Sequence, residues 1–458
     1  MAIRVLLEIP LNYSSGVLYL QLAQHLEKMI LSGSITSGER LPGTRELARM
    51  LKVSRSTVVS AYSVLVEKGL AHQSERSGTY ALNPRLEGEE SSPDEEALFR
   101  FDSESPCKEL LPLSGLSEIL WDMSSPELES ALETSPVEGQ PALRRQLLHH
   151  AALRGIPAHP EEVVVTSGGK DALSTVFRSL KCLGISRLWV EELTYGEIPG
   201  IAKNERLPLR TVPLMDESSL SLLEKLTPKD VLYLIPSFQN PTGRTMSHEL
   251  REKVLSARRR SGFLILEDDS YGELRYGEKS ISALKAMDEG AGIIYIGSFS
   301  QALFPGMRLG YTLLPLSLRE TYLKVSSLRQ GHVSSLVQSV VTRFLAEGKL
   351  AAAVERARRV LSGRMNRLVP LLKAYFPASN VVWPEGGIFL WLPVPGMDGA
   401  HAAILAGGQG VRVTSGERFA PRKTKVSAVR LSVAAVPEES LEEAVSRIAR
   451  AWSGGSTV

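Results

Sequence analysis

The sequence of 458 residues contains very little cysteine, and this scarcity excludes several kinds of protein. Its two cysteines, Cys107 and Cys182, lie far apart, so neither a disulfide framework nor a cysteine zinc site is expected. Such cysteine usage is typical of the reducing cytosol, and we expect a cytoplasmic protein. The eight histidines show no HExxH spacing, and we expect no metal site.

Long hydrophobic segments are also missing. No run of about 18 apolar residues occurs, which argues against a membrane span. The N-terminal apolar run is short and is interrupted by Glu8, so a signal peptide is not expected. Hydrophobic residues make up 43% of the chain and charged residues 23%, which is typical of a globular protein with sizeable cores. At roughly 150 residues per domain, the length allows about three folded units.

The net charge of +2 conceals an uneven distribution of charge. Residues 1–85 carry ten Lys and Arg against six Glu, whereas residues 86–104 carry eight acidic residues and one Arg. A basic module followed by an acidic connector indicates a nucleic-acid-binding domain on a tether. An ordinary solvated surface is the alternative, and charge alone does not distinguish the two.

An acidic segment is predicted to divide the chain. Residues 86–107 are rich in Glu, Asp, Ser and Pro and have few apolar residues, so they can bury too little surface to fold alone. We therefore expect a DNA-binding domain over residues 1–85, an acidic linker over 86–107 and a large domain over 108–458.

The N-terminal domain is predicted to contain three helices and a hairpin. Apolar residues at helical spacing indicate a first helix that stops at Gly33. Thr44 can cap a second helix, and Ser54 can cap a third. A turn signal at Ser77-Gly78 then separates two short strand-like runs. Helix, turn, helix and a hairpin wing are the parts of a winged helix–turn–helix.

The third helix is predicted to present its first turn to DNA. An Arg there can bind guanine bidentately in the major groove, hydroxyls can bind phosphate or base edges, and a helix N-terminus favours phosphate. Arg45 begins the preceding helix, where such residues grip the DNA backbone, and Arg76 lies at the predicted wing tip. The candidate DNA-binding residues are Arg45, Arg55, Ser56, Thr57, Arg76 and Gly78.

Residues 16–82 resemble the GntR-type winged helix–turn–helix of bacterial transcription regulators. The resemblance rests on Ile35–Gly38 and on the motifs LPGTRELARMLKVSRSTV and SERSGTY, which are specific in order and spacing. It implies that double-stranded operator DNA is a partner. A small helical packing domain without DNA affinity is the alternative.

Short apolar runs alternate with helical stretches through the large domain. The runs are VVVTS (163–167), LWVE (188–191), VLYLIP (231–236), FLILED (263–268), IIYIGS (293–298) and LGYTLL (309–314). This alternation predicts an α/β fold with a mainly parallel sheet covered on both faces. A helix-rich stretch over 318–376 follows. Strands near NVVW, GIFLWLPV and AVRLSV, closed by the helix SLEEAVSRIARAW, predict a smaller α+β lobe.

Polar residues and glycines follow the ends of these strands, where parallel sheets bind their ligands. They are Gly168, Gly169, Asn240, Asp268, Tyr271, Ser298, Ser300 and Arg308. Such groups can hold a phosphorylated pyridine: a carboxylate binds the ring N–H, a phenol and an amide bind the ring oxygen, and hydroxyls and an Arg bind phosphate. Each residue alone is more often structural, and the prediction depends on their joint order and spacing.

Residues 139–450 resemble the fold-type I aminotransferases, which use pyridoxal phosphate. The motifs that carry the resemblance are VVVTSGG, VEELTYGE, PSFQNPTG, EDDSYGELRY, GSFSxxLFPGMRLGY, PEGGIFLW and VRLS. Together with the GntR-like domain, the whole chain resembles the MocR-type subfamily of GntR regulators.

This resemblance implies a role for each site residue. Asp268 would pair with the pyridine nitrogen, and Tyr195 would stack on the ring. Asn240 and Tyr271 would bind the phenolic oxygen, and Arg430 would clamp a substrate-like carboxylate. The phosphate ligands would be Ser298, Ser300, Arg308 and the backbone of Gly168 and Gly169.

Three departures from the family pattern affect the expected chemistry. Gln301 occupies the place of the lysine in the family motif SFSK, and a carboxamide can neither form a Schiff base nor shuttle a proton. Thr134 and Ser135 replace a usual Tyr-Gly pair, and Lys170 replaces an uncharged amide. Pyridoxal phosphate is therefore expected to bind only non-covalently, if it binds. Lys170 is expected to contribute charge rather than a Schiff base.

The sequence favours a DNA-binding regulator whose degenerate aminotransferase-like domain senses an amino-acid-like or vitamin B6-related effector. By the resemblance, this regulator would be a homodimer. An active pyridoxal-phosphate-dependent aminotransferase with an accessory N-terminal domain is the alternative, and Gln301 argues against it. A regulator whose large domain serves only for dimerisation is a third hypothesis.

Overall fold

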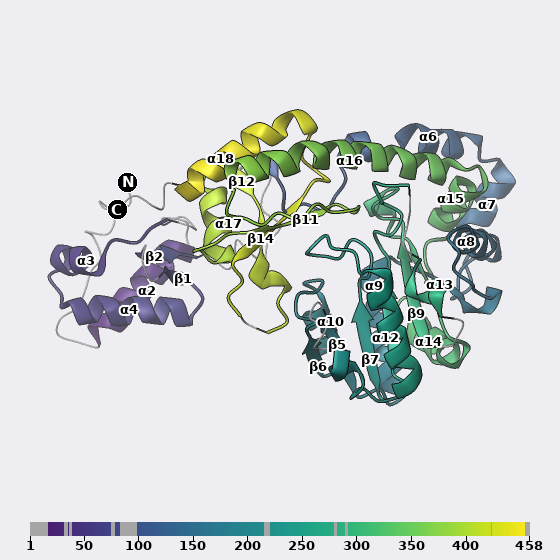
Figure 1. Ribbon diagram of the computed structural model, residues 1–458, viewed down its shortest axis with the longest axis horizontal. Coiled ribbons are helices and arrows are strands. Elements are labelled where there is room, and N and C mark those ends of the chain that lie inside the picture. Colours follow the sequence, from purple (N-terminus) through teal and green to yellow (C-terminus); the bar gives the residue numbers. More distant parts are fainter. Residues whose placement is uncertain are drawn as a thin grey trace. The chain divides into compact units, whose positions relative to one another are not determined.

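The computed structural model describes residues 17–31, 35, 39–74, 78–82, 99–214, 220–278, 282–288, 292–422 and 424–453 (Figure 1). The chain divides into two compact units. The first contains Met1–Phe99, Ala400–Arg412 and Glu443–Val458, and the second contains Arg100–Gly399 and Val413–Glu442. Among the helices that the structure describes, none is long and apolar enough to cross a membrane.

The N-terminal residues form the predicted helices and hairpin. The elements are α2 (Leu18–Leu31), α3 (Thr44–Leu51), α4 (Arg55–Glu67), β1 (Ala71–Ser74) and β2 (Gly78–Ala81). β1 and β2 pair antiparallel, and Leu22, Leu26, Leu47, Val58 and Leu65 are fully buried between the helices. The predicted end of the first helix at Gly33 and the predicted wing-tip residue Arg76 lie outside the described residues.

The starts of α3 and α4 are fixed in different ways. Ser54 caps α4 as predicted, because its Oγ accepts a hydrogen bond from Thr57 N at 3.1 Å. The predicted cap at Thr44 is wrong: Thr44 is the first residue of α3, and Gly43 precedes it without a side-chain cap. Tyr62 Oη donates to Pro42 O at 2.7 Å and ties α4 to the turn before α3.

The large unit contains a seven-stranded sheet in the order β4-β10-β9-β8-β7-β5-β6. The strands are β4 (Val163–Thr166), β5 (Arg187–Glu191), β6 (Leu209–Val212), β7 (Asp230–Leu234), β8 (Leu264–Asp268), β9 (Ile293–Ser298) and β10 (Gly310–Leu313). Only β10 pairs antiparallel within it, so the sheet is mainly parallel, as predicted. The edge strand β6 was not predicted, because only one of its four residues is buried.

Both faces of this sheet are covered, because each apolar strand presents alternate residues to opposite sides. Val231 and Tyr233 pack with α9 (Gly169–Cys182) on one face, and Leu232 and Leu234 pack with α12 (His248–Ser261) on the other. The strands closest to β4 pack against α8 (Pro141–Leu153) and α15 (Ser335–Ala346).

Helices and a small sheet complete the large unit. The further helices are α6 (Leu113–Asp122), α7 (Ser125–Leu132), α10 (Ile198–Asn204), α11 (Leu220–Leu223), α13 (Leu284–Met287), α14 (Leu316–Arg329) and α16 (Lys349–Tyr375). The small sheet has the order β11-β14-β13, with β11 (Phe389–Pro393), β13 (Thr414–Ser415) and β14 (Ala428–Ser432). The predicted strand near NVVW is absent, since residues 380–383 have no strand pairing.

The remaining elements lie at several places along the chain. They are β3 (Phe99–Arg100), β12 (Val411–Arg412), α17 (Gly399–Gly407), α18 (Leu441–Ser453) and short 3-10 turns at Lys108–Leu110, Pro160–Glu162, Pro305–Met307, Gly416–Phe419 and Glu438–Ser440.

The structure differs from the predicted linker over residues 99–107. Phe101 is fully buried, and its carbonyl accepts a hydrogen bond from Ser432 N at 2.8 Å. Cys107 N donates to Ala434 O at 3.1 Å, so this stretch is held against β14 and the residues after it. The acidic composition therefore overestimates the length of the connector, because Phe101 supplies the apolar anchor that composition alone does not weigh.

Candidate ligand pocket and DNA-binding helix

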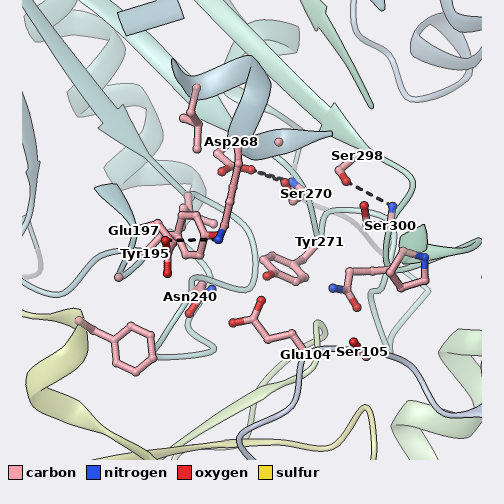
Figure 2. A pocket seen from close by; sticks show the side chains of 18 of the residues that line it. Glu104, Ser105, Tyr195, Glu197, Asn240, Asp268, Ser270, Tyr271, Ser298 and Ser300 are labelled. Carbon is pink, nitrogen blue, oxygen red and sulfur yellow. Dashed lines mark hydrogen bonds and ion pairs between the residues drawn. The ribbon is translucent and has the colours of Figure 1, made fainter. Parts of the chain in front are cut away.

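A cavity of about 380 Å³ lies in the large unit, at the carboxyl ends of the sheet strands (Figure 2). This volume is within the range of small-molecule sites. Its lining includes all but one of the residues predicted to hold a ligand, and the exception is Gly168, which precedes Gly169 at the start of α9. Those in the lining are Gly169, Tyr195, Asn240, Asp268, Tyr271, Ser298, Ser300, Arg308 and Arg430.

Asp268 is the buried carboxylate of this pocket. It ends β8, and it accepts hydrogen bonds from Tyr233 Oη at 2.8 Å and from Ser270 Oγ at 2.5 Å. Burial raises the pKa of Asp268, and the bonds from Ser270 and Tyr233 partly oppose that shift. The side chain is thus fixed at a position that faces the cavity, where it can pair with a cationic ring N–H.

Aromatic and amide groups line the middle of the pocket. Figure 2 shows Tyr195, Asn240 and Tyr271 around the same space, from three different loops. Tyr271 is buried and packs edge-on against Phe389, with 5.1 Å between ring centroids. Burial raises the pKa of both Tyr195 and Tyr271 above the usual tyrosine value, so both phenols remain hydrogen-bond donors.

One end of the pocket gathers groups suited to an anion. The N-terminus of α9 begins after Gly168, whose φ of 83° is available to glycine but strained for other residues. A Cβ at Gly168 would lie 3.3 Å from the guanidinium of Arg308, so the missing side chain admits that cation to the helix start. Ser298 and Ser300 lie at the end of β9 beside it. Helix N-terminus, Arg and hydroxyls together form a phosphate-binding set.

Gln301 also lines the cavity, and it lines a second, smaller hollow that Ser298 borders as well. Lys170 is half exposed, and its Nζ lies 3.3 Å from Glu197 Oε2. Arg418 contacts the same Glu197 carboxylate at 3.3 Å. Lys170 therefore belongs to a surface ion-pair cluster at the pocket mouth.

The departures at Thr134 and Ser135 lie elsewhere. Neither residue is in the pocket lining of the described chain. Ser135 Oγ lies 2.7 Å from Ser335 Oγ, which joins the segment before α8 to the start of α15.

Arg430 lies in β14 and is buried on the floor of the pocket, with 3% of its side chain exposed. Its guanidinium stacks against Phe389 and Phe419, with 4.2 Å and 4.7 Å from Cζ to the ring centroids. Nη1 donates to Asn240 Oδ1 at 2.9 Å and to Glu104 Oε1 at 2.6 Å. Figure 2 shows the Glu104 side chain reaching between Asn240 and Tyr271.

Sequence reasoning missed Glu104, Glu197, Arg418 and Tyr233. Tyr233 could have been found from the sequence, because alternate residues of a buried strand lie on the same face of the sheet as the ligand site. Nothing in the sequence indicates Glu104, since it lies in an acidic stretch and its partner Arg430 is 326 positions away.

The predicted DNA-binding residues of α3 and α4 are at the surface of the first unit. Arg45, Arg55 and Ser56 are exposed, and Thr57 is partly exposed. The hydroxyls of Ser56 and Thr57 each lie 2.8 Å from Ser54 Oγ, which orders the first turn of α4. At Gly78 a Cβ would lie 3.0 Å from Arg40 Nε, so this glycine allows Arg40 to pack against the hairpin.

Two family models match the chain. Residues 126–448 match the model for aminotransferase class I and II, and residues 18–81 match that for bacterial regulatory proteins of the gntR family.

Named regulators are similar over most of the chain. The probable rhizopine catabolism regulatory protein MocR of Rhizobium meliloti is 28% identical, with 78% of this chain and 77% of MocR covered. The HTH-type transcriptional regulator YdcR of Escherichia coli (strain K12) is 25% identical, with 93% of this chain and 98% of YdcR covered.

A solved aminotransferase structure is similar to most of the chain. The structure of LysN, the alpha-aminoadipate aminotransferase of Thermus thermophilus complexed with N-(5'-phosphopyridoxyl)-L-leucine, has a TM-score of 0.71 and 28% identity. The match covers 80% of this chain and 95% of that one. The chain therefore belongs to the aminotransferase class I and II family, and it joins that fold to a DNA-binding domain of the bacterial gntR family.

Proposed function

We propose that this protein is a transcriptional regulator whose aminotransferase-like domain binds its effector without catalysing transamination. The observation that carries the proposal is the composition of one pocket. Its lining contains the buried carboxylate Asp268, the anion-binding set around Arg308, and Gln301. By the resemblance, Gln301 stands at the position of the lysine in the family motif. The pocket thus has groups for binding, and by the resemblance it has a carboxamide at the position where covalent catalysis needs an amine.

The residues fit pyridoxal phosphate or a related vitamin B6 compound. Asp268 would pair with the ring nitrogen, and its raised pKa is lowered again when a cationic N–H lies beside it. Tyr195 would stack on the ring, and Asn240 and Tyr271 would donate to its oxygen. Ser298, Ser300, Arg308 and the backbone at Gly168 and Gly169 would hold the phosphate. In enzymes of this fold the bound cofactor serves as an electron sink for carbanion chemistry.

Gln301 removes two functions that an enzyme of this family requires. Its carboxamide is not a nucleophile, so no covalent bond to the cofactor aldehyde can form there. It is also not basic near neutral pH, so it cannot accept a proton as a general base. Lys170 does not replace it, because its ammonium is paired with Glu197 at the pocket mouth.

Arg430 supports an effector that carries a carboxylate. A guanidinium fork binds a carboxylate bidentately, and the two aromatic rings hold this one in place. An amino acid or its pyridoxyl adduct would therefore extend from the ring site to Arg430.

A homodimer is also part of the proposal, since helix–turn–helix dimers bind paired half-sites. Exposed apolar side chains on α6 and α7 support a self-association surface. Trp121 is 91% exposed, Leu132 69% and Leu120 48%. A cluster of this kind on neighbouring helices is typical of an interaction face.

The proposal is tested by selecting a DNA duplex from a randomised library with the full-length protein and measuring affinity with and without pyridoxamine phosphate and amino acids. We expect salt-sensitive, sequence-specific binding that responds to ligand, with no conversion of amino acid to keto acid. Turnover of an amino acid and a keto acid by the purified protein would support the aminotransferase alternative instead.

A further inference from the structure

The carboxylate site of the pocket already contains a carboxylate of the same chain. Glu104 Oε1 lies 2.6 Å from Arg430 Nη1, and both residues line the pocket. We infer that Glu104 is a specificity-determining residue, a built-in competitor that an effector carboxylate must displace from Arg430. This inference rests on the proposed function, because it concerns the same ligand pocket.

The segment that carries Glu104 is fastened on both sides of it. Before Glu104, Phe101 is buried and its backbone is hydrogen-bonded to that of Ser432. After Glu104, the backbone of Cys107 is hydrogen-bonded to that of Ala434. Arg364, itself buried, holds the next acidic residue, since its Nη2 donates to Glu109 Oε2 at 2.7 Å. Only the short bend between these anchors faces the cavity, where Asp102, Glu104 and Ser105 line it. Displacing Glu104 therefore requires a local change in this bend and leaves its anchors in place.

The contact between Glu104 and Arg430 is one that a ligand can improve. Glu104 uses a single nitrogen of the guanidinium, and Nη2 has only a 3.5 Å contact with Thr414 Oγ1. Arg430 Nε is buried and has no hydrogen-bond partner among the described residues. A free carboxylate can bind bidentately, so it can gain more from Arg430 than the tethered glutamate does.

Moving the Glu104 side chain away from Arg430 also requires little free energy. Its side chain is 34% exposed, whereas that of Arg430 is 3% exposed. When a ligand carboxylate replaces it, Glu104 can return to water and Arg430 remains paired. A ligand without a carboxylate cannot replace Glu104 as the partner of Arg430. Such a ligand and the Glu104 side chain can therefore occupy the pocket together. The pair thus discriminates between ligands by whether they carry an anion at this position.

Calorimetric titration with two probes tests the inference. N-(5'-phosphopyridoxyl)-L-leucine carries a carboxylate, and pyridoxamine 5'-phosphate does not. For the variant Glu104→Gln we expect about tenfold tighter binding of the first probe, because the charge-assisted contact between Glu104 and Arg430 no longer has to be broken. The affinity for the second probe should change by less than about twofold. Glu104→Asp keeps the charge but shortens the reach, and it should tighten the first probe in the same direction by a smaller factor.

Glu109→Gln is the matched control, because it removes a carboxylate from the same segment and from another buried arginine but lies outside the pocket. It should leave both affinities unchanged. If both probes bind but Glu104→Gln does not tighten binding of the carboxylate probe, the inference is overturned and the proposed pocket stands. The same holds if Glu104→Gln weakens binding of that probe, because Glu104 then recognises the ligand amine. If neither probe binds to the wild type or to any variant, the proposed function itself is contradicted.

Discussion

Tyr233 donates a hydrogen bond to Asp268 Oδ2 at 2.8 Å, from the neighbouring strand β7 to the end of β8. Together with Ser270, it holds a buried carboxylate ready in a pocket without any cation of the described chain bonded to it. Such a group serves a ligand at the expense of the stability of the ligand-free protein.

Asp268→Asn is expected to stabilise the ligand-free protein at neutral pH. The pKa of Asp268 is raised above the ordinary 3.8 by burial, so its folded form disfavours ionisation. The unfolded state therefore loses its proton first as pH rises, and the wild type loses stability from about pH 3.8 up to the raised pKa. Thermal unfolding of both proteins at pH 4 and pH 8 should show a larger advantage of the variant at pH 8. A larger advantage at pH 4 would contradict the assignment.

DNA binding should depend on α4 and α3 in different ways. Arg55→Ala and Thr57→Ala should each weaken binding to the selected duplex by about 1–3 kcal/mol if they contact bases. Arg45→Ala should weaken binding to all sequences and flatten the salt dependence, because a phosphate contact carries no sequence information. Fluorescence anisotropy at several salt concentrations measures both effects. If Arg45→Ala and Arg55→Ala weaken binding to random DNA equally, the distinction between a phosphate contact of Arg45 and a base contact of Arg55 is contradicted.

Gln301→Lys should restore a covalent site if the pocket is an inherited cofactor site. The wild type should show no yellow lysine adduct with pyridoxal phosphate and no label after borohydride reduction. The variant should yield a reduced adduct at residue 301, located by peptide mass spectrometry. Gln301→Arg, which adds charge but no nucleophile, is the control and should yield none. An adduct in the wild type, at Lys170 or elsewhere in the site, would refute the non-covalent proposal.

The protein should be a dimer at micromolar concentration. Trp121→Glu places a charge in the exposed apolar cluster of α6 and α7 and should raise the dimer dissociation constant by about tenfold or more, as for a central aromatic anchor. Leu183→Glu, at the exposed end of α9, is the control and should change nothing. Sedimentation velocity checks both, and a monomeric wild type would count against the proposed assembly.

The large sheet and most of its site could be predicted because the information is local. Apolar runs give the strands, and the residues directly after them, such as Asp268 and Ser298, must gather at one edge of a parallel sheet. The antiparallel β10 was within reach too, since the connection from Ser298 to Gly310 is too short for a usual parallel crossover.

Long-range pairs could not be predicted in the same way. The acidic composition of residues 86–107 gave no indication that Glu104 would reach Arg430, because nothing local distinguishes a solvated carboxylate from one placed by Phe101. The cap of α3 failed for another reason: Thr44 is a good cap residue, but the chain enters the helix one position earlier, at Gly43.

The central claim, that the aminotransferase-like domain senses a ligand and controls DNA binding, is tested most directly by operator affinity measured against ligand concentration. With N-(5'-phosphopyridoxyl)-L-leucine, the wild type should change its affinity for the selected duplex. Arg430→Ala should shift the midpoint about tenfold or more to higher ligand concentration, at about 1.4 kcal/mol per decade, with ligand-free DNA affinity unchanged. An affinity for DNA that does not change at any ligand concentration, although the ligand binds, would contradict the claim.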